Sequence, residues 1–332
     1  MQALFLLLIF VALFVLELMY FRVADRFNII DKPNSRSSHT RITLRGGGVV
    51  FYFATFLYMG VNGWVYPAFF MGLTLIAAVS FLDDVRPLSS RFRLPMHFAA
   101  MGLMFYDLGL YGMPLYFAAL AFVLAVGIIN AYNFMDGING ITGAYSLVVL
   151  SALWFVNRNV GFVSSHFIVF MIMAALVFNF FNFRTKARCF AGDVGSVSMA
   201  FVLVFLLGKL IITTENFNYI LLLGVYGIDA VLTIVHRIML RENITEAHRK
   251  HAYQLMANEL RMPHLLVSGL YAAMQLLLAA LVLWLPVAAW VFVAVLALAY
   301  VLVFLLGKLI ITTENFNYIL LLGVYGLQMG VS

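Results

Sequence analysis

The stretch NAYNFMDGING, residues 130–140, separates two long apolar runs and carries three amides and one carboxylate. On a helix, steps of three residues place Asn130, Asn133 and Asp136 in one stripe. Polar groups at a membrane boundary are costly unless they are paired or functional. The stretch therefore predicts membrane helices on both sides of a polar site, with a plain helix end capped by Asx side chains as the alternative.

The composition extends this interpretation to the whole chain. Of the 332 residues, 64% are hydrophobic and 10% are charged, and the mean hydropathy is +1.02. Ordinary globular domains are roughly 45–50% apolar and about 25% charged. We therefore predict an all-α fold, a polytopic transmembrane helix bundle. The single cysteine, Cys189, excludes an intramolecular disulfide, and the net charge of +6 indicates membrane orientation rather than binding to nucleic acid.

Eleven apolar segments are candidate membrane helices. They are 3–21, 47–62, 64–82, 95–112, 114–131, 140–156, 162–181, 195–213, 217–235, 264–284 and 287–307. The first has no basic segment before it and no small-residue cleavage site, so we interpret it as a retained membrane helix rather than a signal peptide. We expect about 10–11 spans in one bundle.

Lys and Arg residues predict the orientation of the bundle. Of 20 such residues, 17 lie in connections on one face, at 22–46, 83–94, 182–194 and 236–263. By the positive-inside rule this face is cytoplasmic, and the N-terminus is then outside. The 130–140 stretch joins the same face, so we expect the active site there.

A duplicated segment marks the C-terminus. Residues 202–227 recur without a change at 301–326. Two distant identical copies cannot stack as a repeat array, and the second would turn on the opposite side of the membrane from the first. We interpret the copy as a local duplication or an assembly artefact. The predicted organisation is one integral-membrane domain over residues 1–307 and a tail, 308–332, that holds most of the copy and no site residue.

Two acidic motifs lie on the predicted cytoplasmic face. Asp83 and Asp84 directly follow an apolar span, and adjacent carboxylates repel unless a cation or a proton compensates them. Such a pair suits Mg²⁺, which is commonly held by one or two carboxylates plus phosphates; a solvated helix end paired with nearby arginines is the alternative. Asp193 stands between Gly192 and Gly195 at the start of a span, where it predicts either a helix cap or a phosphate site.

A basic motif, His248-Arg249-Lys250-His251, lies in the longest late connection. Helical spacing would put its two histidines on one face. A zinc site would need more nitrogen or thiolate ligands, so we predict an anion site for a diphosphate, with contact to anionic lipid as the alternative. Near the N-terminus, three glycines follow Arg45 and predict close approach of the backbone to a ligand or to another helix.

Acids, amides, basic groups and glycines on one face together predict a site for Mg²⁺ and a phosphorylated substrate, because phosphoryl transfer relies on positioning and charge neutralisation. In chain order, the motifs are DKPN (31–34), RS (36–37), H (39) and RGGG (45–48). They continue with DD (83–84), NAYNFMDGING (130–140), AGDVGS (191–196) and AHRKHAYQ (247–254). They resemble those of the polyprenyl-phosphate N-acetylhexosamine-1-phosphate transferases of glycosyltransferase family 4, relatives of phospho-MurNAc-pentapeptide translocase. The resemblance covers about residues 1–300.

The resemblance implies a Mg²⁺-dependent enzyme, with Mn²⁺ as a second candidate ion, in the bacterial cytoplasmic (inner) membrane. Such enzymes transfer a sugar 1-phosphate from a UDP-amino sugar to undecaprenyl phosphate and release UMP. The implied partners are these two substrates and membrane lipid, with no nucleic acid and with a homodimer left open.

The resemblance also assigns residues. Asp83 and Asp84 correspond to the family's paired acids near the metal and the lipid phosphate, and Asp193 corresponds to its metal-binding acid. All three are therefore candidate catalytic residues and metal ligands. The candidate substrate-binding residues are Arg45, Asn130, Asn133, Asp136, Asn139, His248, Arg249 and His251. Asp229, inside the span 217–235, is implied to support the site from within the membrane.

Departures from the family pattern indicate the branch. The peptidoglycan branch carries a denser histidine cluster and a lysine-rich segment after its paired acids, whereas here residues 85–93 read VRPLSSRFR and AYQ follows His251. We therefore expect the branch that starts O-antigen or capsule chains, with N-acetylglucosamine or a 6-deoxy amino sugar. The peptidoglycan transferase and an ion-coupled transporter stay as alternatives, since boundary carboxylates also mark ion pathways.

Overall fold

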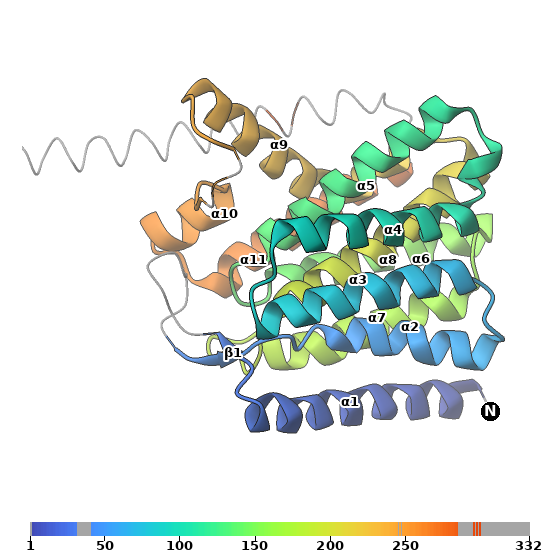
Figure 1. Ribbon diagram of the computed structural model, residues 1–332, viewed down its shortest axis with the longest axis horizontal. Coiled ribbons are helices and arrows are strands. Elements are labelled where there is room, and N and C mark those ends of the chain that lie inside the picture. The colour runs from blue at the N-terminus through green and yellow to red at the C-terminus, as the bar shows by residue number, and fades with distance from the viewer. Residues whose placement is uncertain are drawn as a thin grey trace, which may run out of the picture.

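The computed structural model describes residues 2–31, 41–244, 246 and 248–284, with the single positions 295, 297 and 299, and consists of long helices lying side by side (Figure 1). The helices are α1 (Gln2–Arg26), α2 (Val49–Asn62), α3 (Pro67–Val85), α4 (Ser90–Leu108), α5 (Leu115–Met135), α6 (Ile141–Val160), α7 (Ser165–Asn182), α8 (Gly192–Thr214), α9 (Gly224–Met239), α10 (Ala252–Gln254) and α11 (His264–Trp284). Shorter elements are the 3₁₀ turns η1 (Leu110–Gly112) and η2 (Phe217–Leu223), the π-helical turn η3 (Leu255–Glu259), and the strands β1 (Ile30–Asp31) and β2 (Thr43–Leu44).

Eight helical segments in the described residues are long and apolar enough to cross a membrane, with η2 and α9 counted as one, Phe217–Met239. Helix α2 is apolar but has 14 residues, and α4 carries Arg91 and Arg93 in its first turn. Ten of the eleven predicted spans coincide with helices, while the eleventh, 287–307, falls almost wholly outside the described residues. The predicted all-α, polytopic membrane bundle is confirmed, and its orientation stays a prediction.

Helix α8 forms the centre of the bundle and packs against α2, α3 and α5. Its N-terminal half is rich in small residues, which let neighbouring helices approach closely where no hydrophobic drive exists between helices in lipid. Further along, Phe201 and Phe205 stack on Phe69 of α3, with ring centroids 5.6 and 4.1 Å apart. Helix α1 lies at the edge and exposes large apolar side chains such as Leu4 and Leu8, as expected for a lipid-facing helix.

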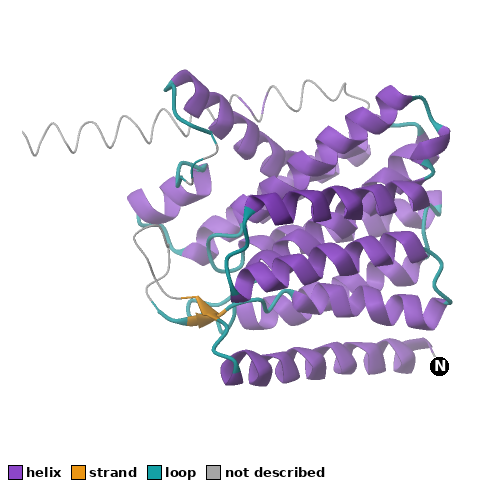
Figure 2. Cartoon of the chain, viewed as in Figure 1, coloured by secondary structure: helices purple, strands orange, loops and turns teal. Residues whose placement is uncertain are grey.

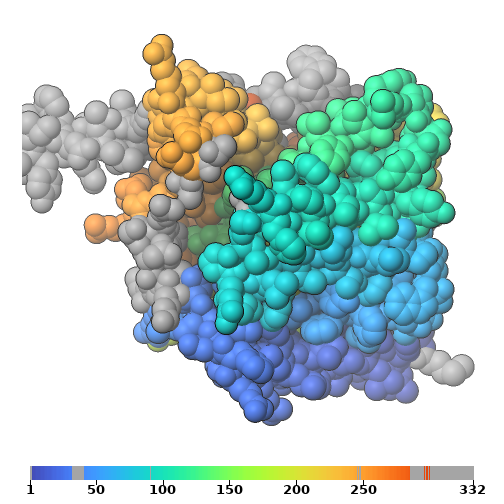
Figure 3. Space-filling view, viewed as in Figure 1, coloured from blue at the N-terminus to red at the C-terminus, as the bar shows by residue number. Residues whose placement is uncertain are grey.

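The charged connections gather at one end of the bundle, on the left in Figure 1, where β1 and α10 also lie. Figure 2 shows the two strands as a small orange ribbon at this end, with Ile30 paired opposite Leu44. The connection after α9, orange in Figure 3, projects from the bundle there. We call this region the charged end.

The first copy of the duplicated segment reverses direction as predicted. Helix α8 stops at Thr214, Glu215 takes a left-handed backbone conformation, and η2 begins at Phe217. The second copy, 301–326, and the tail 308–332 lie outside the described residues.

Candidate active site

The charged end is held together by the segment after β2, which runs beside the segment before α8. The Gly47 N–H donates to the Phe190 carbonyl at 2.8 Å, and the Gly48 N–H donates to the Ala191 carbonyl at 3.1 Å. A Cβ on Gly195 would lie 2.5 Å from the Gly48 Cα, so neither position has room for a side chain. The predicted close approach of the glycine segment to a helix is confirmed, and it brings the preceding arginine to the start of α8.

Asp84 joins α3 to that helix start. Its Oδ1 accepts the Asp193 N–H at 2.9 Å and its Oδ2 accepts the Val194 N–H at 3.0 Å. These are two of the N–H groups that a helix leaves without an internal partner. The Arg45 Nε also lies 2.6 Å from Oδ1, and the Asp84 side chain has no exposed surface. Both oxygens are therefore engaged, and Asp84 fixes α8 and Arg45 in place.

Asp193 and Asp83 are more open. The Asp193 Oδ1 accepts hydrogen bonds from Asn133 at 3.1 Å and from Arg45 at 3.3 Å, and its side chain is 22% exposed. Asp83 is 11% exposed, and its Oδ2 lies 2.6 Å from Arg93 Nη1. The same Arg93 nitrogen is 3.8 Å from the Asp193 Oδ2, so it stands between the two carboxylates. These contacts bring together residues from five separate segments of the chain.

We call this group the carboxylate centre. Its members are Asp83, Asp84, Asp193, Arg45, Arg93 and Asn133. Burial lowers the pKa of the Arg45 guanidinium, but attraction to Asp84 and Asp193 more than offsets it, so that pKa is raised and Arg45 stays charged. With all three acids ionised, three carboxylates and two guanidiniums give the centre a formal charge of −1.

The donor set fits Mg²⁺ in the way this ion usually binds proteins. Among the described residues, no three Asp, Glu, His or Cys side chains are arranged as a complete metal site. Mg²⁺ needs no such cage, because it keeps waters and is held by one or two carboxylates plus substrate phosphates. Asp193 and Asp83 offer partly exposed carboxylates in a centre with net negative charge, whereas the Asp84 side chain is fully buried. Asp83 would exchange a partner for the ion, because its Oδ1 accepts the Leu88 N–H at 2.5 Å and its Oδ2 pairs with Arg93.

The 130–140 stretch contributes less to the centre than its spacing predicts. Helix α5 ends at Met135, and Asp136 follows it with φ −83° and ψ 59°, outside the helix. Asn130 is exposed and donates to the Val126 carbonyl of its own helix at 2.8 Å. The predicted single stripe of polar residues is therefore wrong, because an Asn facing away from the bundle satisfies its amide on the preceding turn. Only Asn133 reaches the centre.

The other two polar residues of the stretch lie nearby. Asp136 accepts the Thr142 hydroxyl at 2.7 Å, and burial is the main cause that raises its pKa to about 7. Asn139 is buried, donates to the Arg184 carbonyl at 2.9 Å, and lines a pocket of about 610 Å³. That pocket also carries cationic side chains, Arg41 and Lys186, and no acidic residue is among the described residues that line it. Its charge suits an anionic ligand.

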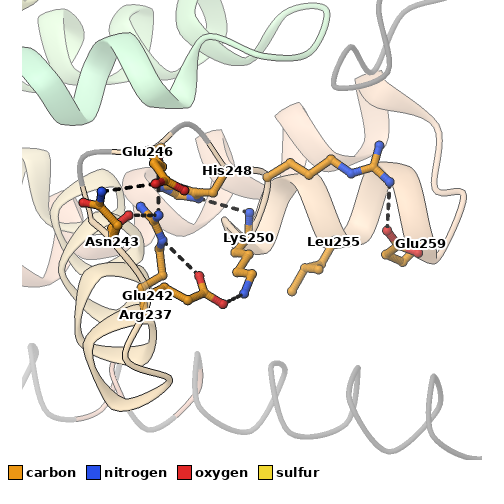
Figure 4. A pocket seen from close by; sticks show the side chains of 9 residues that line it. Arg237, Glu242, Asn243, Glu246, His248, Lys250, Leu255 and Glu259 are labelled. Atoms are coloured by element: carbon orange, nitrogen blue, oxygen red, sulfur yellow. Dashed lines mark hydrogen bonds and ion pairs between the residues drawn. The ribbon is translucent and has the colours of Figure 1, made fainter.

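The connection after α9 is built on a buried arginine (Figure 4). The side chain of Arg237 is 4% exposed and donates to the carbonyls of Asn243 at 2.5 Å, Ile244 at 3.1 Å and Glu246 at 3.1 Å. Its Nε lies 3.3 Å from the Glu242 carboxylate. One cation thus satisfies several backbone carbonyls and fixes the path of the chain.

The basic residues of the predicted anion site have acidic neighbours in the same connection. Lys250 forms an ion pair with Glu242, and Arg249 Nη2 lies 3.6 Å from Glu259 Oε1. These groups line a pocket of about 690 Å³, in which Lys250 and Glu242 meet at its lower edge in Figure 4. Because positive and negative side chains alternate around it, this pocket differs from the uniformly basic site that the motif predicts.

The two histidines of the motif are close but do not share a helix. Residues 248–250 are irregular and α10 begins only at Ala252, so the predicted helical face is wrong, although the His248 and His251 rings lie 5.0 Å apart. Burial is the first cause that lowers the pKa of His248 to about 4, and the neighbouring His251 and Arg237 side chains lower it further. His251 is buried, with Nδ1 3.0 Å from Asp229 Oδ1.

The connection after α9 touches the end of α5 beside the carboxylate centre. The Tyr253 hydroxyl donates to the Phe134 carbonyl at 2.8 Å, and the Phe134 and His251 rings are 6.2 Å apart. Phe134 directly follows Asn133, whose amide reaches Asp193. Two predicted groups of residues, far apart in the sequence, therefore meet at one end of the bundle.

Comparison with known proteins decides the family. Residues 66–211 match the sequence profile of glycosyl transferase family 4. This stretch of the chain belongs to glycosyl transferase family 4. It contains every residue of the carboxylate centre except Arg45, so the family match and the clustered acids concern the same part of the molecule.

The relatives that the comparison finds carry related names. The chain is 26% identical over 264 residues to a "probable undecaprenyl-phosphate N-acetylglucosaminyl 1-phosphate transferase" of Bacillus subtilis, covering 71% of this chain and 72% of that protein. It is 26% identical to the undecaprenyl-phosphate alpha-N-acetylglucosaminyl 1-phosphate transferase of Thermotoga maritima, covering 71% and 76%. The protein of that name from Escherichia coli K12 is 27% identical, and the match spans 60% of each chain. The predicted family is confirmed; the O-antigen branch stays a prediction.

Sequence reasoning missed several residues of this family 4 site. Arg93 bridges two carboxylates, and Arg41 and Lys186 line the pocket beside Asn139. Arg41 and Lys186 lie in connections that were counted for orientation only, and Arg93 was considered only as one of the arginines that could pair with Asp83 and Asp84 at a solvated helix end. Their clustering on one face was the available signal, but a charge count cannot tell which arginine turns toward an acid.

Proposed function

We propose that this protein transfers an N-acetylhexosamine 1-phosphate from a UDP-sugar to undecaprenyl phosphate and releases UMP. The carboxylate centre carries the proposal, because three acids and two arginines from separate segments converge at the charged end of a membrane bundle. The names of the family 4 relatives supply the substrate class. A membrane bundle with a polar site at one end suits a reaction between a lipid phosphate and a water-soluble nucleotide.

The proposed reaction is a direct displacement. An oxygen of the lipid phosphate forms a bond to the phosphorus that carries the sugar. The bond from that phosphorus to the bridging oxygen of UMP breaks, and UMP leaves with that oxygen. Both reactants are anions, so their approach to a centre with net negative charge requires added positive charge.

The residues of the centre take separate roles in this proposal. Asp83 and Asp193 would hold Mg²⁺ or Mn²⁺, which, when bound, supplies positive charge against the phosphates of both substrates. Asp84 holds Arg45 and the start of α8 in place. Arg45 and Arg93 present guanidinium groups beside the carboxylates, where they can bind phosphate oxygens in a fixed geometry. Asn133 orients Asp193 through its amide.

The pocket lined by Asn139, Arg41 and Lys186 is our candidate for the nucleotide part of the donor, because its described lining is cationic. The sugar is N-acetylglucosamine or a 6-deoxy amino sugar, and the product starts an O-antigen or another cell-surface polysaccharide. The names of the relatives and the segment VRPLSSRFR, residues 85–93, support this choice over the peptidoglycan transferase.

A panel of UDP-sugars tests the proposal. Purified protein is incubated with each sugar nucleotide, Mg²⁺ and undecaprenyl phosphate, and UMP and lipid-linked sugar are measured. We expect UMP release with UDP-N-acetylglucosamine only when the lipid phosphate is present. A preference for the UDP-MurNAc-pentapeptide would assign the peptidoglycan reaction instead, and solute or ion uptake by vesicles without any UMP release would favour a transporter.

A further inference from the structure

Asp229 of α9 is surrounded by hydrogen-bond donors inside the bundle. It is 1% exposed, and its Oδ1 accepts the Thr233 hydroxyl at 3.2 Å and the Ala252 N–H at 3.3 Å. Its Oδ2 accepts the Tyr271 hydroxyl of α11. The fourth group is His251, whose Nδ1 lies 3.0 Å from Oδ1. A carboxylate that several donors surround in this way is held at one fixed position.

The contacts of Asp229 determine which nitrogen of His251 carries hydrogen. Oδ1 receives the Ala252 N–H, so this oxygen acts as an acceptor. An ionised carboxylate has no hydrogen to donate, so we assign the His251 Nδ1 that faces the same oxygen as the N–H donor. In the neutral ring the other nitrogen, Nε2, is an acceptor, and the hydrogen bond made by one ring nitrogen fixes the role of the other.

The Nε2 atom is buried and has no hydrogen-bond partner among the described residues. Buried polar atoms without a partner are few in native proteins, and each one calls for an explanation. The ring lies against Phe134, which follows Asn133 of the carboxylate centre. The His251 ring thus lies near the end of α5, next in sequence to a residue of the carboxylate centre, and the carboxylate that orients it comes from within the bundle.

We propose that Asp229 is a positioning residue which fixes the Nδ1–H form of His251, so that Nε2 accepts a hydrogen bond from a hydroxyl or amide N–H of the amino sugar. The inference rests on the proposed function and names the sugar as the part of the donor that this side chain recognises. Phosphate oxygens are acceptors themselves, so they cannot pair with Nε2 of the neutral ring. A sugar with several hydroxyls and an acetamido N–H offers the matching donors.

Two substitutions of His251 separate the two ring nitrogens. The amide of His251→Gln extends to about the position of Nε2, whereas the shorter amide of His251→Asn reaches only about the position of Nδ1. We expect His251→Gln to retain more kcat/KM for UDP-N-acetylglucosamine than His251→Asn, with the latter falling roughly 5- to 150-fold. If His251 only packs through its contact with Asp229, His251→Asn is the better replacement, and this order would overturn the inference.

The inhibition constant of UDP, which has no sugar, distinguishes sugar from phosphate. We expect both His251 variants and Asp229→Asn to leave inhibition by UDP within about twofold of wild type while kcat/KM for the sugar donor falls. Parallel loss of UDP affinity would mean that the histidine binds phosphate, which contradicts the inference.

Thr233→Val is the matched control, because it removes one donor to the Asp229 Oδ1 and leaves the His251 contact in place. We expect it to keep donor kcat/KM within about threefold of wild type, with thermal unfolding midpoints measured for all variants. If the His251 variants fail to fold, equal losses in Asp229→Asn and Thr233→Val would assign the whole network to packing and overturn the inference. A wild-type protein that turns over no UDP-sugar would instead remove the proposed function itself.

Discussion

The carboxylate centre and the connection after α9 carry similar residue types but differ in how far apart their charge partners lie in the sequence. In the centre, Arg45 pairs with acids 39 and 148 positions away, on α3 and α8. In the connection, Arg237 and Lys250 share Glu242, five and eight positions away. Local pairing leaves the lining of the pocket after α9 formally neutral, with three basic and three acidic side chains, whereas convergence over long range leaves the centre with a net negative charge. A charge imbalance that only the fold creates is the better sign of a ligand site.

The largest effect should come from the most exposed acid of the centre. We expect Asp193→Asn to lower UMP release by roughly 10²–10³-fold or more, because the amide keeps the shape but loses the charge that a hard cation needs. The measurement is turnover as a function of Mg²⁺ concentration. Asp25→Asn, an exposed carboxylate at the end of α1, is the matched control and should behave as wild type. Unchanged Mg²⁺ dependence in Asp193→Asn would leave Asp193 as a helix residue without a metal role.

Arg45→Lys should have the next largest effect. The guanidinium spans Asp84 and Asp193 with two different nitrogens, and the single ammonium of Lys cannot bridge both. Loss of one charge-assisted hydrogen bond costs roughly 1.5–3 kcal/mol, which corresponds to about a 10- to 150-fold fall in kcat/KM. Arg22→Lys, an exposed arginine on α1, serves as the control. Activity of Arg45→Lys equal to that of the control would show that the bridge is dispensable.

Much of the fold could be predicted, because hydropathy acts locally. The spans follow from apolar runs that need no knowledge of their neighbours. Helix α4 shows the limit of this reasoning: its apolar run begins near residue 95, but the helix begins at Ser90. The additional turn contains Arg93, which pairs with Asp83. The partner of this charged turn comes from another helix, and hydropathy contains no such information.

The site could be predicted only in part for the same reason. The acids of the centre were identified from their motifs, and the glycine segment indicated a close approach. Asp84 caps α8 because of the way α3 and α8 pack. Asn130 donates to its own helix because its side of α5 faces outward. The pairing of His251 with Asp229 joins residues 22 positions apart. Each of these contacts is a property of the packed bundle.

The comparison predicts a small effect for Arg249→Lys. The Arg249 guanidinium is 44% exposed and lies 3.6 Å from a Glu259 carboxylate that is itself 41% exposed. Exposed ion pairs are worth about 0–1 kcal/mol, and Lys retains the charge. We expect kcat/KM for the UDP-sugar to stay within about threefold of wild type. A loss as large as that of Arg45→Lys would mean that the diphosphate binds at the connection after α9, and the contrast between the two regions would fail.

The smallest predicted effect is a pH dependence in the connection after α9. The pKa of His248 is lowered from its ordinary value of 6.5 to about 4, first by burial and then by the neighbouring His251 and Arg237 side chains. Between these two values the unfolded chain binds more protons than the folded one, so the contribution of His248 to stability rises with pH from about 4 to 6.5 and is constant above. Because the ring is only half-buried, water screens part of this effect. On going from pH 7 to pH 5, we expect the thermal unfolding midpoint of the wild type to fall by roughly 2 °C more than that of His248→Gln. The measurement is the thermal midpoint of both proteins at the two pH values, with His166→Gln on α7 as the matched control. Equal pH dependence in wild type and His248→Gln would mean that the folded connection does not lower the pKa of this ring. Burial and the neighbouring side chains would then not act on His248 as described.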